Sequence, residues 1–228
     1  MGDSNIAGMT VVDHPLVHDK LGRLRDAATK SKEFRELCTE LAMLVAYPAT
    51  LDLETTATQV ASPIDWASSR ELVRIPLLVP ILRAGLGLVP GFHALMPQAM
   101  VAHVGVYRDP DSLKAVPYYS NLPDDLRGRR AFVLDPMLAT GGSAIATVDL
   151  LTERGAVVED LRFICIIAAP EGAKALHEAH PQLRSFACAI DRNLNQHGYI
   201  VPGLGDAGDR LFGRGAGRSP QTRTGALR

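Results

Sequence analysis

The chain has 228 residues, of which 46% are hydrophobic and 21% are charged, and its formal net charge is −1. This length and apolar content suit a single domain with a sizeable core. The near-zero charge argues against a protein whose whole surface binds nucleic acid. The sequence has no apolar run of about 18 residues and no secretory signal pattern, so we expect no membrane anchor and a cytoplasmic location.

The three cysteines, Cys38, Cys165 and Cys188, lie in apolar surroundings without Cys-x-x-Cys spacing. This pattern favours reduced core thiols over disulfides or a zinc site. His14 and His18 are four residues apart, but Pro15 follows the first of them, so a helical metal-binding pair is not favoured.

The sequence of the N-terminal third predicts a short tail followed by a helical region. Residues 1–10 are small and polar, and we expect them to be disordered, with 11–17 extended and leading into a helix. Ser31 is a plausible N-cap for the next helix, which we expect to end at Tyr47-Pro48. Its apolar stripe consists of Phe34, Leu37, Leu41 and Leu44. The pattern of residues 50–72 does not distinguish between types of secondary structure, and their acidic residues indicate a surface location.

Two predicted strands each end at an arginine. Residues 75–82 form an apolar run that leads into Arg83-Ala84-Gly85-Leu86-Gly87, and residues 101–107 form a second strand that ends at Arg108. An arginine after a buried strand needs solvent, a carboxylate or an anion, and we favour an anion at Arg83. The long segment 109–128 is typical of a loop or hairpin that acts as a lid.

The central motif is a strand-to-helix turn. Residues 131–134 are typical of a buried strand, which Asp135-Pro136 ends, and helical spacing starts at Ser143 and stops before Gly155. The turn Thr140-Gly141-Gly142-Ser143 would present unpaired N–H groups at a helix N-terminus, which suits a phosphate. An ordinary capped turn is the alternative. Asp135 lies where it could accept hydrogen bonds from the hydroxyl groups of a sugar attached to that phosphate.

The following elements define the fold class. We expect a strand at 161–169, a helix at 170–180 and a strand at 186–190. This alternation predicts an α/β fold with a mainly parallel sheet flanked by helices. Ligands bind beyond the carboxyl ends of such strands, so Arg83, Arg108 and Asp135 should converge there.

The C-terminal stretch is rich in glycine. Five glycines and one proline between Gly198 and Gly213 argue against regular structure over most of it. Its irregular backbone could face a planar ligand, and the alternative is a loose loop. Residues 214–228 carry four arginines and no acids, and we expect a disordered tail after one domain spanning 11–213.

Four of these stretches occur in one order that resembles the uracil phosphoribosyltransferases, within the type I phosphoribosyltransferases. They are residues 79–87, 135–143, 168–172 and 197–208, and the resemblance extends over about 11–213. The sequence departs from the family at Pro48-Ala49-Thr50-Leu51, where relatives commonly carry a glutamate.

The resemblance implies transfer of ribose 5-phosphate from phosphoribosyl diphosphate (PRPP) to N1 of uracil, which gives UMP and diphosphate in pyrimidine salvage. Arg83, Arg108 and Asp135 would be the catalytic residues. PRPP would also contact Pro136, Met137, Leu138, Ala139, Thr140, Gly141, Gly142, Ser143 and Asp206. Uracil would be bound by Ile200, Gly205, Asp206 and Ala207. The resemblance also implies Mg²⁺ bound mainly through PRPP, a homo-oligomer and a GTP effector, with no nucleic-acid partner.

Two alternatives remain at this point. A nucleotide-sensing regulator could use the same fold to bind RNA, but it would need a basic face. A related transferase could act on a purine or on orotate, although the C-terminal stretch is of the uracil type. A P-loop kinase is excluded because the sequence has no Gly-x-x-x-x-Gly-Lys-Ser/Thr motif.

Overall fold

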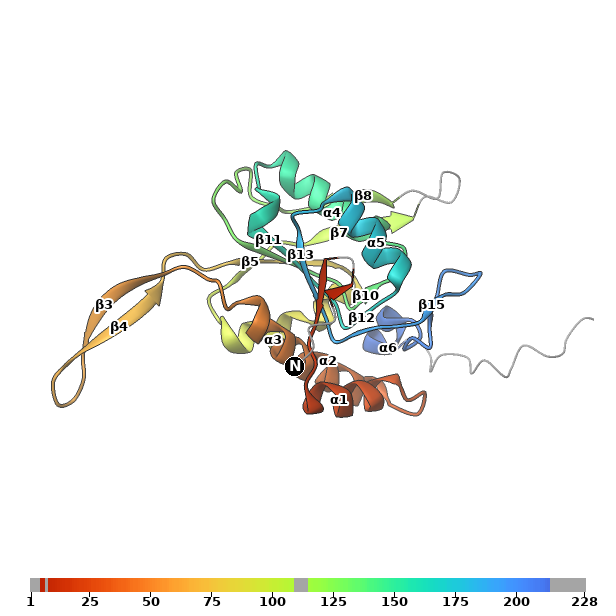
Figure 1. Ribbon diagram of the computed structural model, residues 1–228, viewed down its shortest axis with the longest axis horizontal. Helices are drawn as coiled ribbons and strands as arrows, with labels where there is room; N and C mark the ends of the chain where they lie inside the picture. Colours follow the sequence, from red (N-terminus) through yellow and green to blue (C-terminus); the bar gives the residue numbers. More distant parts are fainter. Residues whose placement is uncertain (1–4, 7, 109–114, 214–228) are drawn as a thin grey trace, which may run out of the picture.

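The computed structural model describes residues 5–6, 8–108 and 115–213. Its main sheet has nine strands in the order β1-β2-β13-β11-β9-β5-β7-β8, with β6 paired to β5 (Figure 1). The strands of this sheet are β1 (Asn5–Ile6), β2 (Met9–Val11), β5 (Leu77–Leu82), β6 (Met100–Val101), β7 (Val104–Arg108), β8 (Ala115–Ser120), β9 (Ala131–Leu134), β11 (Leu161–Ile164) and β13 (Arg184–Ala187).

The centre of the sheet is parallel, as predicted. The strand β9 pairs in parallel with β5 on one side and with β11 on the other, and β13 continues beyond β11. All four residues of β9 and all four of β11 are buried. Strands covered on both faces read as continuous apolar runs, which is why these segments could be found from the sequence.

Helices cover both faces of the sheet (Figure 1). The helices α1 (Pro15–Arg25), α2 (Ser31–Ala49) and α3 (Val89–Leu95) share one core, to which the sheet contributes Leu78, Phe132 and Leu134. The helices α4 (Gly142–Glu153) and α5 (Pro170–Ala179) share the other, with Val79 and Val133. Successive strand residues therefore point to opposite cores.

Smaller elements extend the main layers. The strands β10 (Met137–Leu138), β12 (Ile167–Ala168) and β14 (Ala189–Ile190) form a three-stranded parallel sheet, and β15 (Asn193–Leu194) pairs with β16 (Ile200–Val201). The strands β3 (Thr55–Ala61) and β4 (Trp66–Leu72) form a hairpin that projects from the body (Figure 1). The short helices are η1 (Ala84–Gly87), η2 (Val158–Asp160) and α6 (Ala207–Phe212).

Several expectations need correction. The expected N-terminal tail includes strands β1 and β2, of which β2 pairs in parallel with β13 and buries Met9 in the core. The helix α2 continues through Pro48 to Ala49, so the proline lies in its last turn rather than after it. The expected strand at 161–169 is two strands, β11 and β12, which belong to different sheets.

Other predictions concern the ends of the chain and the lid. Part of the predicted lid is strand β8, antiparallel to β7, while 109–114 lie outside the described residues. The expected tail at 214–228 also lies outside them. Cys38, Cys165 and Cys188 are free and buried, as expected. Among the described residues, no helix is both long and apolar enough to cross a membrane.

Candidate active site

The structure brings the turn after β5 against the end of β9. A Cβ atom added to Gly85 would lie 2.2 Å from the backbone oxygen of Leu134, the residue before Asp135. Only glycine permits this approach, so the turn that carries Arg83 is fixed beside the strand end that carries Asp135. The Arg83 side chain is 53% exposed and available to a ligand.

Asp135 is half-buried at this strand end. Its Oδ1 accepts a hydrogen bond of 3.3 Å from the backbone N–H of Met137. Burial raises the pKa of the Asp135 carboxyl to about 7, and the bond from Met137 opposes the shift only in part. No ion pair to Asp135 forms within the part of the chain that the structure describes. The carboxyl therefore has acceptor capacity for a ligand.

The predicted phosphate turn has the expected geometry. Gly141 adopts φ 86° as the N-cap residue, and the helix α4 begins at Gly142 with no side-chain cap. A Cβ atom on Gly172 would lie 2.3 Å from the backbone oxygen of Ala139, so the start of α5 packs directly against this turn. The start of α5 thus supports one side of the turn between β10 and α4, and the N-terminus of α4 remains available to a ligand on the other side.

The C-terminal segment lies beside Arg83. A guanidinium nitrogen of Arg83 is 3.6 Å from Oδ1 of Asp209, and the guanidinium carbon is 5.9 Å from the ring centroid of Phe212. A Cβ atom on Gly87 would touch Leu211, which is buried. The helix α6 therefore packs on η1 and brings the C-terminal segment to the same edge as Asp135.

Three of the four residues predicted to bind uracil, Gly205, Asp206 and Ala207, lie at the start of α6, and the fourth, Ile200, is the first residue of β16. The side chains of Ile200 and Ala207 are buried, while Gly205 and Asp206 are exposed. Asp206 is the N-cap of α6, and its Oδ1 accepts a 2.9 Å hydrogen bond from the N–H of Asp209. The expectation of little regular structure was wrong here, since this cap starts a helix of six residues.

Arg108 is the last residue of β7, the strand next to β5. The antiparallel β8 follows it, and a Cβ atom on Gly142 would lie 3.5 Å from Cβ of Ala115 in β8. The β7–β8 hairpin thus stands next to the start of α4. The strands β9, β5 and β7 are neighbours in the sheet. Asp135 follows β9, Arg83 follows β5 and Arg108 ends β7, so all three lie at the edge where these parallel strands end.

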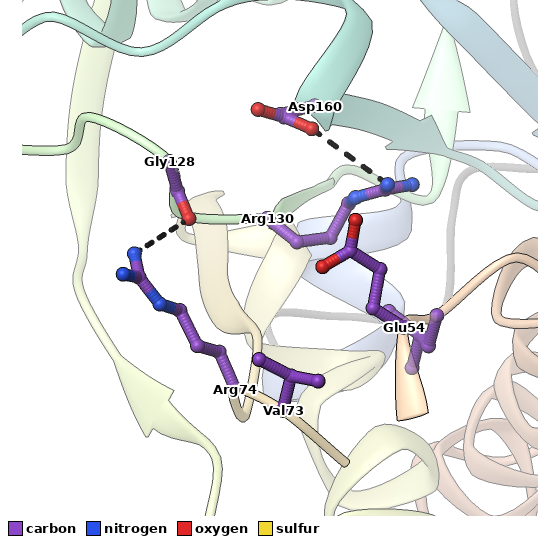
Figure 2. Close-up of a pocket in the computed structure, with 7 residues that line it drawn as sticks. Glu54, Val73, Arg74, Gly128, Arg130 and Asp160 are labelled. Atoms are coloured by element: carbon purple, nitrogen blue, oxygen red, sulfur yellow. Dashed lines mark hydrogen bonds and ion pairs between the residues drawn. The ribbon is translucent and has the colours of Figure 1, made fainter. Parts of the chain in front are cut away.

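A pocket of about 340 Å³ lies at the opposite, amino edge (Figure 2). It is lined by Leu53, Glu54, Val73, Arg74, Gly128, Arg130 and Asp160. Its charged groups are already paired in part, since Arg74 donates to the Gly128 carbonyl and Arg130 lies 3.7 Å from Asp160. The pocket contains none of the predicted site residues.

Sequence reasoning missed the residues that support the C-terminal segment. Arg25 in α1, Asp191 after β14 and Arg210 within α6 bind its backbone. Asp209 was missed as the partner of Arg83, although Asp206 followed three residues later by Asp209 fits the pattern of a capped helix start.

A mainly parallel sheet with a glycine-rich turn, an acid at the preceding strand end and a C-terminal segment over the same edge defines the class of phosphoribosyltransferases. The family model for uracil phosphoribosyltransferase matches residues 11–214. The chain belongs to the uracil phosphoribosyltransferase family, whose members are pentosyltransferases.

Individual relatives agree with this family. The chain is 54% identical over 206 residues to a uracil phosphoribosyltransferase of Symbiobacterium thermophilum, covering 90% of this chain and 98% of the relative. It is 51% identical over 204 residues to one of Lactococcus lactis subsp. cremoris, covering 89% and 97%. A solved structure of the AQ2163 protein from Aquifex aeolicus is similar with a TM-score of 0.84 and 34% identity, covering 90% of this chain and 97% of that one.

Proposed function

We propose that this enzyme transfers the 5-phosphoribosyl group of PRPP to N1 of uracil and releases UMP and diphosphate, as a step of pyrimidine salvage. The observation that carries the proposal is the meeting of Arg83, Asp135, the 140–143 turn and the C-terminal segment at one edge of the sheet. The family membership supports the same reaction.

The PRPP half of the site is the strand-to-helix turn with its flanking charges. Residues 136–143 and the α4 N-terminus would hold the 5-phosphate with backbone N–H groups. Asp135 would accept hydrogen bonds from the ribose hydroxyls. Arg83 and Arg108 would bind the diphosphate, and Asp206 would contact PRPP from the other side.

This arrangement suits the chemistry of the step. As the C1–O bond of PRPP breaks, the sugar gains oxocarbenium character and the diphosphate gains negative charge. Arg83 and Arg108 would stabilise that charge, while the fixed turn keeps C1 in line with N1 of the base. The diphosphate leaves with the bonding electrons of C1–O, and N1 of uracil forms the new bond to C1 and loses its proton to the solvent or to the diphosphate. No covalent enzyme intermediate is needed.

The base half of the site is the backbone around Ile200 and from Gly205 to Ala207. Uracil presents an acceptor, a donor and an acceptor at O4, N3–H and O2. Backbone N–H, C=O and N–H groups would answer these in order, and such groups cannot exchange donor for acceptor. Cytosine presents the opposite pattern at its first two positions, so this site should reject it.

Mg²⁺ is the expected cofactor. Among the described residues, no group of three or more His, Cys, Asp or Glu side chains could hold a metal ion. We expect Mg²⁺ to arrive with PRPP and to be held by its phosphate oxygens and water, the ligands that Mg²⁺ prefers. When bound, Mg²⁺ would neutralise charge on the diphosphate.

We further propose a cytoplasmic homo-oligomer with GTP as an effector, on the basis of the family resemblance. One feature supports the oligomer. In the projecting β3–β4 hairpin, Trp66 is 68% exposed and Ile64, in its tip, is 96% exposed. A two-stranded ribbon is marginally stable alone, so contact with a second subunit would stabilise it.

The test is UMP formation from labelled uracil and PRPP in the presence of Mg²⁺. We expect product only when both substrates are present, with EDTA reducing the rate. Equal or faster product formation from orotate or a purine base would contradict the assignment to uracil. UMP-dependent RNA binding without any turnover would contradict the enzymatic function.

A further inference from the structure

Hydrogen bonds connect the backbone proposed to bind uracil to the end of helix α1. Two arginines make these contacts, Arg25 at the last position of α1 and Arg210 in α6. Neither belongs to the motifs that define the site, and both reach the backbone between Ile200 and Asp206.

Arg25 and Asp191 together bind both backbone polar groups of Gly203. Arg25 forms a two-pronged ion pair with the Asp191 carboxylate, with N···O distances of 2.8 and 2.5 Å. Oδ2 of Asp191 accepts from the N–H of Gly203 at 2.8 Å, and Arg25 donates to the carbonyl of Gly203 at 2.8 Å. The Asp191 side chain is only 4% exposed.

The contact with Gly203 also fixes Ile200. Gly203 adopts φ 66°, and a Cβ atom there would lie 2.2 Å from the backbone oxygen of Ile200. The β15–β16 pairing holds Ile200 from the other side, opposite Leu194. A shift of Gly203 would therefore move a backbone that the proposed function assigns to the base.

Arg210 fixes the next residue of the segment. One of its nitrogens donates to the carbonyls of Leu204 and Leu24, at 2.9 and 2.7 Å. The other donates to the carbonyl of Asp26 at 2.5 Å, and the guanidinium lies 4.3 Å from the ring centroid of Phe34. Arg210 thus binds Leu24 and Asp26, the residues on either side of Arg25. Both arginines therefore connect the C-terminal segment to the same end of α1.

We propose that Arg25, Asp191 and Arg210 are positioning residues, which hold the backbone from Ile200 to Asp206 in the geometry that selects the base. This inference rests on the proposed function. Backbone groups cannot rotate to follow a displaced ligand, so their selectivity depends on rigid support. A buried ion pair adds little net stability, because burying its charges costs free energy. Its strict geometry is suited to holding a loop in one conformation.

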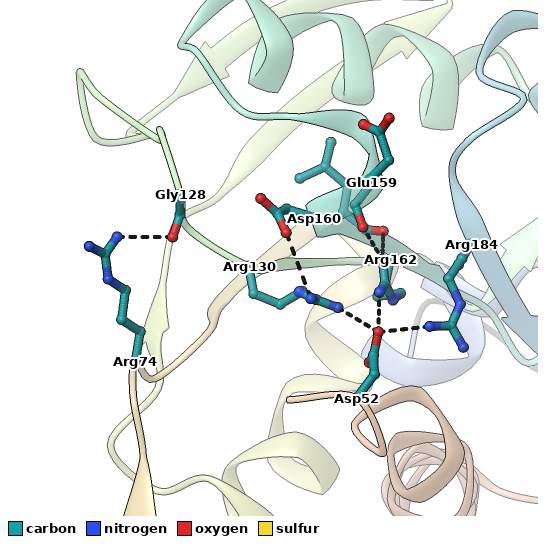
Figure 3. Close-up of polar contacts among 9 residues, drawn as sticks. Asp52, Arg74, Gly128, Arg130, Glu159, Asp160, Arg162 and Arg184 are labelled. Carbon is teal, nitrogen blue, oxygen red and sulfur yellow. Dashed lines mark hydrogen bonds and ion pairs between the residues drawn. The ribbon is translucent and has the colours of Figure 1, made fainter. Parts of the chain in front are cut away.

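The experiment compares Arg25→Met, Arg25→Lys and Asp191→Asn with Asp52→Asn as the control. Asp52 lies at the amino edge of the sheet, where it accepts hydrogen bonds from Arg130, Arg162 and Arg184 (Figure 3). Its substitution also breaks a multiple ion pair, but far from the C-terminal segment. All four variants are assayed as the full chain for KM of uracil, KM of PRPP and the ratio of uracil to cytosine use.

We expect Arg25→Met to raise KM for uracil on the order of 10- to 100-fold and to lower the uracil-to-cytosine ratio at least tenfold, since small misplacements of bound groups cost about that much. KM for PRPP should stay within about threefold. Asp191→Asn should have a smaller effect of the same kind, and Arg25→Lys should restore part of the loss because it keeps the charge. Asp52→Asn should leave all three quantities within about twofold of the wild type.

Amide hydrogen exchange separates this inference from the proposed function. Residues 200–206 should exchange faster in Arg25→Met, even at a temperature where the chain remains folded, and not in Asp52→Asn. If the wild type uses a base other than uracil, the proposed function fails, while the exchange and the KM for that base still test the positioning role. Unchanged exchange in the Arg25 variants, an unchanged KM for the base, or equal changes in Asp52→Asn would overturn the inference.

Discussion

Replacing Asp135 by Asn should make the protein more stable while it loses the use of PRPP. Burial raises the pKa of Asp135 from 3.8 to about 7, so the folded protein holds this proton more tightly than the unfolded chain does. Between about pH 4 and pH 7 the unfolded state therefore binds fewer protons, and the free energy of unfolding falls as the pH rises through this window. Asparagine is neutral at every pH and escapes that loss.

The magnitude follows from the size of the shift. A shift from 3.8 to about 7, at about 1.4 kcal/mol per pKa unit, corresponds to on the order of 4 kcal/mol above pH 7. The asparagine amide adds two donors that need partners, so we expect a net gain of about 2 to 4 kcal/mol at pH 8. That corresponds to roughly 5 to 15 °C in Tm for a chain of this length. At pH 4 the gain should nearly vanish.

The assay is thermal unfolding of both proteins from pH 4 to pH 8, together with KM for PRPP. An amide has a single acceptor oxygen for the two ribose hydroxyls, so PRPP use should fall by roughly 100-fold or more. A Tm difference that does not change with pH would refute the burial argument. Wild-type use of PRPP by the variant would refute the role of the carboxylate.

Other substitutions test separate parts of the site. Arg83→Ala should lower kcat/KM by about 10- to 100-fold through the loss of a charge-assisted contact, with little change in Tm because the side chain is exposed; unchanged kinetics with a large fall in Tm would make Arg83 structural. Gly172→Ala should raise KM for PRPP by about tenfold, since its Cβ would displace Ala139 and the turn beyond it; an unchanged KM would contradict that support. Truncation after Gly213 should keep activity within about twofold because the removed sequence has no apolar pattern to dock, and a larger loss would assign the tail a role. Uracil should be preferred over cytosine by roughly 30- to 10⁴-fold, from two mismatched contacts, and comparable use of both in a competition assay would defeat recognition by the backbone.

The sequence was informative where one local signal sufficed. The strand β9 has the predicted bounds because its four residues are all apolar and a proline follows Asp135. The turn at 140–143 was found because the pattern changes there from strand to helix. Both signals depend only on neighbours in the chain, so no knowledge of the packing was needed.

The sequence was uninformative where packing decides. The β3–β4 hairpin is exposed on both faces, so its strands lack the alternation of apolar and polar residues that marks a half-buried strand. The helix α6 was missed because Gly208 weakens helix propensity, while its packing on η1 stabilises it. Arg25 and Asp191 are 166 positions apart, and only the fold brings them together.

The carboxylates at the two edges of the sheet differ in whether arginines pair with them, and this difference supports the choice of site. At the amino edge, Asp52 accepts hydrogen bonds from three arginines (Figure 3). Burial raises the pKa of Asp52, but Arg130 and Arg162 outweigh that effect and lower the pKa to about 2. At the carboxyl edge, Asp135 is desolvated without such a partner among the described residues, and Arg83 is 53% exposed beside a single carboxylate. A desolvated carboxyl without a charged partner costs stability. A ligand with both hydroxyl donors and phosphate oxygens would satisfy Asp135 and bind the exposed Arg83 at once. The charged groups of the amino-edge pocket are paired in part within the protein, and the pocket contains none of the predicted site residues.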